Sequence, residues 1–204
     1  MRNKVGNTFI MTGIVLVLAA LSLFAWNRME SRRADNAVQA ILPAVVDAIG
    51  DSIQEPPTEP HQMTETEPEG TEMTVVEIDG YGYVGYLSIP ALQLELPVMS
   101  EWDYDRLKTA PCRYSGSTKT DDFVIAAHNY TRHFGTLRTL EPGDEVFFTD
   151  MDGVVSTYEV AEVNTLSPTA VEEMTGSGYA LTLFTCTYGG QSRVTVRCTR
   201  TEEN

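Results

Sequence analysis

The chain has 204 residues, of which 42% are apolar and 21% charged, and its formal net charge is −15. This length accommodates one ordinary domain with appendages. The charge is unevenly distributed, because no Lys or Arg occurs between Arg33 and Arg106 while acidic residues accumulate there. Binding to a nucleic acid requires a basic patch that neutralises phosphates, so this balance argues against a nucleic acid as a partner.

An uncharged apolar run occupies residues 8–26, with basic residues on both sides. Its length suits one helical crossing of a bilayer, which takes about 20 residues. A cleaved signal peptide is the alternative, but its apolar region usually spans about 7–15 residues and ends in small residues. Bulky Leu23, Phe24 and Trp26 stand here instead. We therefore predict a retained transmembrane anchor within residues 1–33, whose flanking charges alone leave its orientation open.

Two segments of different character follow the anchor. Apolar residues recur at helical spacing in residues 34–50, which predicts an amphipathic stalk helix that Pro43 kinks or begins. The pattern does not say whether this helix packs on a domain or on lipid. Residues 51–74 are rich in Pro, Glu and Thr with almost nothing to bury, so we expect a solvated acidic linker.

From residue 75 onward, short strand-like segments alternate with turn residues. The predicted strands are 83–89, 92–98, 123–127, 145–148, 157–163, 179–185 and 194–196. Seven or eight short strands with few helices predict a closed β-barrel or a sandwich, formed by residues 75–204.

Strand alternation places three chemically complementary residues on an outer face. If Leu181 and Leu183 face the core, Cys186 points away from it at the end of its strand. The same parity sends His128 outward at the end of its strand and Arg193 outward at the start of the last one. Alternation alone does not say whether these strands are neighbours.

Cys186, His128 and Arg193 would form a sufficient set for acyl transfer if they met. A free thiol with a pKa near 8.5 is only about 3% thiolate at neutral pH, so a cysteine nucleophile needs a base or a cation nearby. An imidazole can take the thiol proton and return it to a leaving amine. A guanidinium, which is always charged, can stabilise the oxyanion that forms on the attacked carbonyl.

The sequence around these residues resembles the sortase family. Residues 182–186 read TLFTC, which is similar to the TLxTC signature of sortases, and Arg193 follows at the opening of the next strand, as in that family. His128, in the segment AAHN, is similar to the family's histidine motif and precedes Cys186 by 58 residues.

The resemblance extends upstream of the histidine motif. Residues 83–90 read YVGYLSIP and residues 96–98 read LPV, and both resemble the entry into the sortase domain. Together these motifs cover almost all of residues 81–200 in the expected order.

The resemblance implies a mainly β fold, a closed eight-stranded sortase-type barrel with a few short helices behind the transmembrane helix. It further implies a single-pass protein of the cell membrane with an extracellular catalytic domain. Such enzymes cleave a sorting-signal peptide of the LPxTG kind, hold the acyl group as a thioester, and pass it to an amine of a cell-wall precursor or a pilin. No cofactor and no metal are expected.

The same resemblance assigns catalysis to Cys186, His128 and Arg193, and we assign Thr185 and Thr182 beside the nucleophile to substrate binding. The short connection between Cys186 and Arg193 and the residues Thr187 and Tyr188 favour a class B-like or small unclassified subclass.

Two other functions stay open from the residues alone. One is a different cell-wall cysteine transpeptidase, although the compact His-Gly-Cys arrangement of L,D-transpeptidases is absent. The other is a non-catalytic anchored β-domain that binds a surface partner.

Several individual residues also have alternative interpretations. Arg197 shares a strand face with Arg193 and could take its place. His133 is expected to be a solvated loop residue, and a zinc site built from it, His128 and a cysteine lacks a tight pair of ligands. Cys112 and Cys198 are interpreted as structural, and a disulfide between them stays open.

Overall fold

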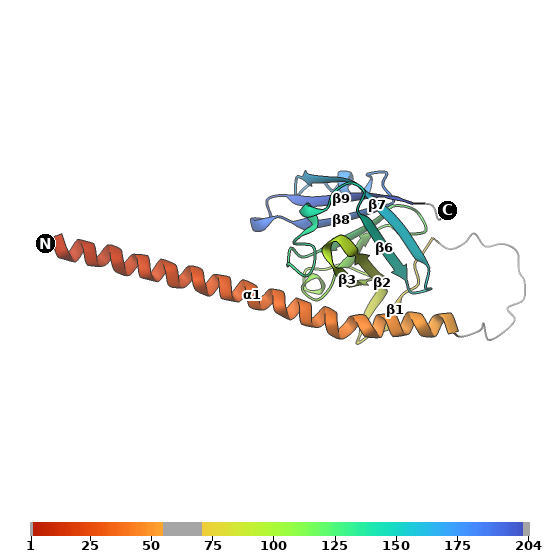
Figure 1. Ribbon diagram of the computed structural model, residues 1–204, viewed down its shortest axis with the longest axis horizontal. Helices are drawn as coiled ribbons and strands as arrows, with labels where there is room; N and C mark the ends of the chain where they lie inside the picture. Colours follow the sequence, from red (N-terminus) through yellow and green to blue (C-terminus); the bar gives the residue numbers. More distant parts are fainter. Residues whose placement is uncertain (1, 55–70, 202–204) are drawn as a thin grey trace, which may run out of the picture. The chain divides into compact units, whose positions relative to one another are not determined.

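The computed structural model describes residues 2–54 and 71–201, which form two α-helices, four short 3-10 helices and nine strands (Figure 1). The helices are α1 (Arg2–Gln54), η1 (Pro90–Leu92), η2 (Arg106–Lys108), η3 (Leu137–Thr139), α2 (Val171–Thr175) and η4 (Tyr188–Gly190). The strands are β1 (Val76–Ile78), β2 (Tyr81–Ile89), β3 (Leu94–Met99), β4 (Cys112–Ser115), β5 (Phe123–Ala127), β6 (Glu145–Asp150), β7 (Val155–Leu166), β8 (Leu181–Cys186) and β9 (Arg193–Arg200).

Eight of these strands close into a barrel. They pair in the order β2-β3-β4-β5-β8-β9-β7-β6, and β6 pairs back onto β2, while β1 adds to the first residues of β2. The pairs β3–β4 and β5–β8 are parallel and the other pairs are antiparallel. The closed eight-stranded barrel with a few short helices is therefore confirmed.

A glycine permits the closure between β2 and β6. Gly85 lies at a register shift in β2 and has a φ of 142°. A Cβ atom at this position would collide with the carbonyl oxygen of Thr149 on β6. Only glycine combines this backbone conformation with so close an approach, so residue 85 allows β2 to pair with both β3 and β6.

The barrel wall is apolar on both faces. The interior cluster contains inward residues from every long strand, among them Leu87, Leu96, Phe123, Ile125, Phe148, Tyr158, Leu181, Leu183 and Val196. A second cluster covers part of the outside and contains Val45, Ile49, Tyr83, Met99, Leu107, Val124, Ala126, Met174 and Phe184. The strands beneath this cover are consequently buried on both sides, so the β5 burial pattern shows no alternation.

The chain divides into two compact parts, residues 1–33 and residues 34–204. In the first part, the apolar side chains between Phe9 and Trp26 are exposed, and α1 is long and apolar enough to cross a membrane. In the second part, α1 continues through Pro43, and its residues Val38, Val45 and Ile49 are buried in the two clusters. The stalk predicted at residues 34–50 thus packs on the β-domain.

Two features of the second part were not predicted correctly from the sequence, namely the strand β4 and the extent of the linker. The strand β4 has only four residues, which is too short for an alternating pattern to reveal in the sequence. The linker predicted at residues 51–74 was wrong at both ends, because residues 51–54 belong to α1 and Met73 is buried in the interior cluster; residues 55–70 lie outside the described residues.

Candidate active site

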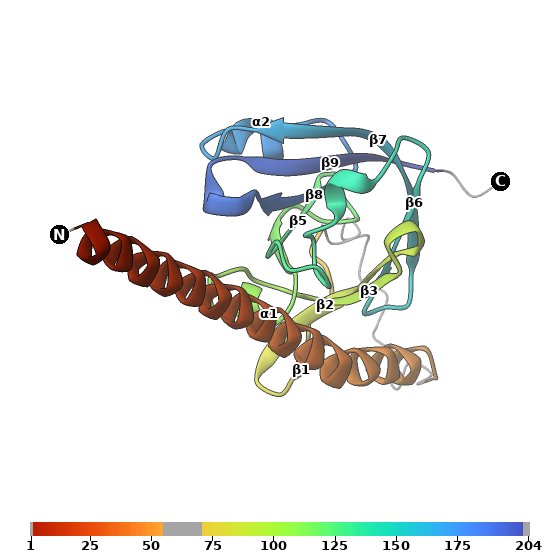
Figure 2. The same ribbon diagram turned by 60° about the vertical axis from the view of Figure 1, so that its left-hand side comes forward.

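Strand register brings three of the predicted site residues to one edge of the barrel. Because β5 and β8 are parallel with Ala127 opposite Thr185, the next residues, His128 and Cys186, leave the two strands side by side. On the other side of β8, Cys186 lies directly opposite Arg193 on the antiparallel β9. The three strands β5, β8 and β9 run side by side in Figure 2.

A cavity of about 270 Å³ opens at this edge. Its lining contains all three residues together with apolar and aromatic side chains: Trp102, Tyr104, Leu107, Tyr114, Ala126, Ala127, His128, Pro168, Val171, Met174, Phe184, Thr185, Cys186 and Arg193. The pocket is therefore mostly apolar with a few polar groups in its lining, which is the usual composition of a ligand site.

The three cysteines occupy different environments. Cys112 and Cys198 are completely buried, and burial raises the pKa of each thiol to about 12. Cys186 is only partly buried and faces the cavity. All three are unpaired, and Cys112 and Cys198 lie in different apolar clusters, so the disulfide left open by the sequence is absent. Cys186 alone among them combines access to a ligand with neighbouring polar groups.

The connection between Cys186 and Arg193 is a tight turn. The Thr187 amide donates to the Ser192 carbonyl at 3.0 Å, and the Ser192 amide donates to the Thr187 hydroxyl at 3.1 Å. Arg193 Nη1 donates to the carbonyl oxygens of Gly190 and Ser192 at 3.1 and 3.2 Å. The guanidinium is thus fixed by its own turn beside the thiol-bearing strand end.

The two threonines assigned to substrate binding differ in position. Thr185 lines the cavity, and its hydroxyl donates to the Ala127 carbonyl at 2.8 Å. This hydrogen bond ties the ends of β8 and β5 together, directly before Cys186 and His128. Thr182 is only 1% exposed, lies 3.3 Å from the Ser177 hydroxyl, and is not part of the cavity lining.

An aromatic wall on the cavity was not identified from the sequence. Trp102 stacks on Tyr114 with ring centroids 5.4 Å apart, and Tyr114 meets Phe184 edge-on at 5.1 Å. Tyr104 packs edge-on against Trp102 at 5.3 Å. The signal was available in part, because Trp102 and Tyr104 are large aromatic residues in a connection between strands, where nothing local requires them.

Arg197 belongs to a different neighbourhood from Arg193. Its Nη1 atom lies 3.0 Å from Glu162 Oε1, its Nη2 atom donates to the Glu173 carbonyl at 3.0 Å, and it packs over the Tyr179 ring. Arg197 does not line the cavity. Shared strand parity therefore did not place the two guanidinium groups together, because they are four residues apart along β9.

The interpretation of His133 as a solvated residue was wrong. Its side chain is 0% exposed, and burial together with the neighbouring His128 lowers its pKa to about 4. Among the residues that the structure describes, no group of three or more His, Cys, Asp or Glu side chains could hold a metal ion.

Comparison with known proteins places this arrangement in a family. The sequence model of the sortase domain matches residues 87–201. Sortase C from Streptococcus pneumoniae, a structure described in connection with pilin substrate specificity, is 25% identical with a TM-score of 0.52, and the match covers 59% of this chain and 70% of that one. Sortase C1 from Streptococcus agalactiae is 26% identical with a TM-score of 0.53, and the match covers 63% of this chain and 72% of that one.

A longer structural match shows the fold alone. Sortase C from Clostridium perfringens SM101 is 19% identical with a TM-score of 0.51, and the match covers 89% of this chain and 99% of that one. A comparison with curated proteins gives no match.

Proposed function

The chain belongs to the sortase family of cysteine transpeptidases, and from this premise we propose that it cleaves an LPxTG-like sorting signal and transfers the acyl group to an amine. The acceptor would be a cell-wall precursor or a pilin subunit. The single observation that supports this proposal most strongly is the register of β5, β8 and β9, which places His128 and Arg193 on the two sides of Cys186.

Each of the three residues has one role in the proposed reaction. The Cys186 sulfur attacks the threonine carbonyl of the sorting signal, forming a C–S bond while His128 holds the thiol proton. The oxyanion of the tetrahedral intermediate faces the Arg193 guanidinium. When the intermediate collapses, the C–N bond breaks and the imidazolium gives its proton to the leaving amine, so that a thioester remains on Cys186.

The second half of the reaction reverses these steps with a new amine. The acceptor amine attacks the thioester carbonyl and loses a proton to His128, and the Cys186 thiolate leaves and recovers that proton. The enzyme is thereby regenerated, and the net change is the exchange of one amine for another on the acyl group.

The aromatic wall and Thr185 supply the substrate-binding end of the same site. An apolar cavity of about 270 Å³ suits the leucine and proline side chains of an LPxTG-like peptide better than charged ones. Thr185 acts by fixing the two strand ends, and Thr182, a buried residue of β8 outside the cavity lining, supports the strand rather than contacting the peptide.

The proposed arrangement of the chain follows from the same premise. Residues 1–33 would anchor the protein in the cell membrane as a single pass, and residues 75–204 would form the catalytic domain on the outer side. Residues 34–50 would be the stalk, which α1 extends to Gln54, so the acidic linker predicted at residues 51–74 would begin after that helix. The protein would belong to a class B-like or small unclassified subclass, because the turn of residues 187–192 leaves no room for a long insertion.

A peptide panel read by mass spectrometry tests this function. The full chain in detergent is incubated with peptides of the LPxTG kind, without and then with hydroxylamine as the amine acceptor. We expect an acyl adduct on Cys186 and faster product release with hydroxylamine. A Cys186→Ala variant should form no adduct. Absence of both adduct and cleavage across a broad panel would refute the proposal, and retained binding of a surface partner by the alanine variant would favour a non-catalytic domain.

A further inference from the structure

The loop that follows β5 is compact and begins at His128. The Phe134 amide donates to the His128 carbonyl at 3.1 Å, and the amides of His133 and Gly135 both donate to the Tyr130 carbonyl at 2.9 Å. Gly135 approaches the loop so closely that an added Cβ atom would lie 2.6 Å from the Asn129 carbonyl oxygen. The loop backbone is therefore closely packed, which leaves its residues little room to move independently.

Three rings connect the far side of this loop to the cavity. The His128 and Tyr130 rings have centroids 4.8 Å apart with planes inclined by 33°, and the Tyr130 and His133 rings are 5.5 Å apart. His128 faces the cavity, whereas His133 is fully buried. Tyr130 thus packs against both the His128 ring and the buried His133 imidazole.

His133 is an unfavourable residue for a purely structural position. Neither of its ring nitrogens makes a hydrogen bond of ordinary geometry within the described residues, and its interaction with the Ala34 backbone is outweighed by burial, which lowers its pKa to about 4. A buried polar group without a partner destabilises a fold, and an apolar side chain of similar volume would remove that penalty. Violations of this kind are expected where a residue serves function rather than stability.

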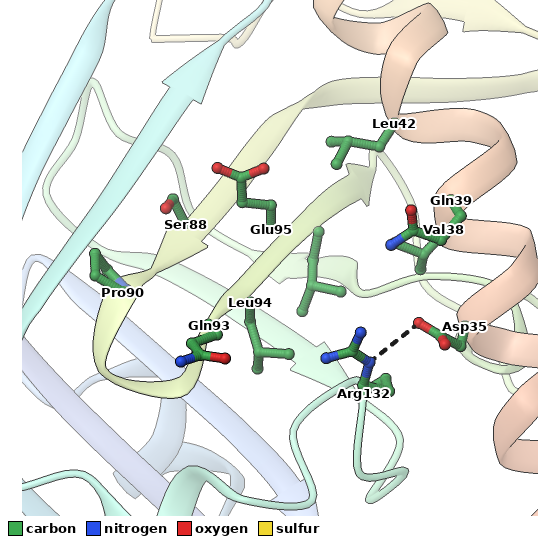
Figure 3. A pocket seen from close by; sticks show the side chains of 11 residues that line it. Asp35, Val38, Gln39, Leu42, Ser88, Pro90, Gln93, Leu94, Glu95 and Arg132 are labelled. Carbon is green, nitrogen blue, oxygen red and sulfur yellow. Dashed lines mark hydrogen bonds and ion pairs between the residues drawn. The ribbon is translucent and has the colours of Figure 1, made fainter.

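The stalk segment of α1 covers the same loop. Asp35 Oδ1 lies 3.3 Å from Arg132 Nε, beside a cavity of about 450 Å³ that separates α1 from β2 and β3 (Figure 3). Ala34 is 1% exposed, and its backbone together with Asp35 favours the charged form of His133 against the larger effect of burial. The groups that face His133 therefore come from α1 as well as from its own loop.

We propose that Tyr130 and His133 are positioning residues for the His128 imidazole, and that the α1 segment beginning at Ala34 holds them in place through Asp35 and Arg132. This inference rests on the proposed function, in which His128 handles the proton. The ion pair is partly exposed, with side chains 53% and 32% exposed, and such pairs contribute little to stability. The ion pair is expected to act on the orientation of the His128 imidazole, because proton transfer requires a correctly placed ring.

Substitutions at the two rings separate positioning from stability. His133→Leu in the full chain in detergent should raise the melting temperature and yet lower kcat for the LPxTG-like peptide by about tenfold, with KM unchanged. Tyr130→Ala should lower kcat similarly, while Tyr130→Phe, which keeps the ring, should stay within about twofold of wild type. A residue with only a structural role would instead change activity and melting temperature in the same direction.

A probe that needs no substrate gives a second measurement. Iodoacetamide alkylation of Cys186, located by mass spectrometry from pH 6 to 9, reports how the imidazole affects the thiol. We expect His133→Leu and Tyr130→Ala to change this pH profile in the same direction as His128→Ala. Buried Cys112 and Cys198 should stay unmodified in the folded protein.

Charge exchange tests the connection to α1. Asp35→Arg and Arg132→Asp should each lower kcat by about threefold, and the double variant should recover it, because the ion pair is restored in reverse. Arg138→Ala, which removes an exposed charge from η3, is the matched control and should have no effect.

The outcomes distinguish this inference from the proposed function. If Cys186→Ala retains activity, the proposed function fails and the inference fails with it. If Cys186→Ala is inactive while the His133 and Tyr130 variants keep the wild-type kcat and alkylation profile, only the inference is overturned. Equal kcat for both single charge variants and the double variant would overturn the part that concerns α1.

Discussion

The inner and outer faces of the barrel wall are buried by different partners. On β8, Leu181 and Leu183 pack in the interior among side chains of the other strands. Phe184, on the opposite face, is covered by an outer cluster that draws on α1, the connection between β3 and β4, and α2. The candidate active site lies where this outer cover leaves an open cavity. The interior therefore follows from the strands themselves, whereas the site depends on which segments dock against them.

The sharpest comparison across the wall is between two cysteines. Cys186→Ala should lower transpeptidation by about 10³-fold or more, because it removes the proposed nucleophile. Cys198→Ala, in the interior, should leave kcat unchanged and lower the free energy of unfolding by about 1–2 kcal/mol through lost packing. Peptide turnover and chemical denaturation measure the two effects. Equal loss of activity in both variants would contradict the assignment of Cys186.

A pair of arginines on β9 tests the next largest effect. Arg193→Ala should lower kcat by about 10²–10³-fold, as expected if it removes the proposed oxyanion donor. Arg197→Ala breaks the contacts with Glu162 and the Glu173 carbonyl. It should lower the free energy of unfolding by about 1 kcal/mol with little change in kcat. Steady-state kinetics with the same peptide distinguishes them. A larger kinetic defect in the Arg197 variant would reverse the assignment.

The contributions of the barrel interior and of the α1 cover to the free energy of unfolding can be measured separately. Leu183→Ala should lower the free energy of unfolding by about 2–5 kcal/mol, since it opens a cavity in the interior. Val45→Ala on α1 should lower it by about 2 kcal/mol. Val46→Ala, at a position that is 44% exposed, is the control and should be nearly neutral. Denaturant unfolding of the full chain checks the series, and no effect of Val45→Ala would show that α1 does not contribute to the outer cover.

Buried His133 makes the loop under α1 sensitive to acid. Its pKa is about 4 in the folded chain against an ordinary value of 6.5, so the unfolded chain binds more protons between these pH values. The free energy of unfolding is therefore unaffected by His133 protonation above about pH 6.5. It decreases as the pH falls toward 4, by about 3 kcal/mol at most, because protons bind preferentially to the unfolded chain. Unfolding measured from pH 7 to 4 should show a smaller decline for His133→Leu than for the wild type, and parallel curves would contradict this prediction.

Much of the barrel could be predicted because its strands carry local patterns. The strands β2, β3 and β5 to β9 each overlap a predicted segment, since alternation and turn residues mark them. β1 and β4 were missed because three or four residues give no period. The solvated interpretation of His133 failed for a related reason, because loop residues have no pattern and the covering helix is about 100 positions away in the sequence.

The candidate site was predictable only in part. Parity gave the direction in which Cys186, His128 and Arg193 leave their strands, and the resemblance to sortases supplied their adjacency. The aromatic wall of Trp102 and Tyr114 and the position of Thr182 outside the cavity required the structure. The catalytic roles themselves remain predictions that the variants above test.

The sequence by itself determined the apolar helix near the N-terminus, the strand-rich domain, the inward sides of β5, β8 and β9, and the family. These properties depend on residue type and short spacing, which are local. Only the tertiary structure decided that β5 and β8 are parallel neighbours, that Cys186 stands opposite Arg193, and that α1 covers the loop carrying His128. Such contacts join residues far apart in the chain, and their free energy exists only once the strands have paired and the helix has docked.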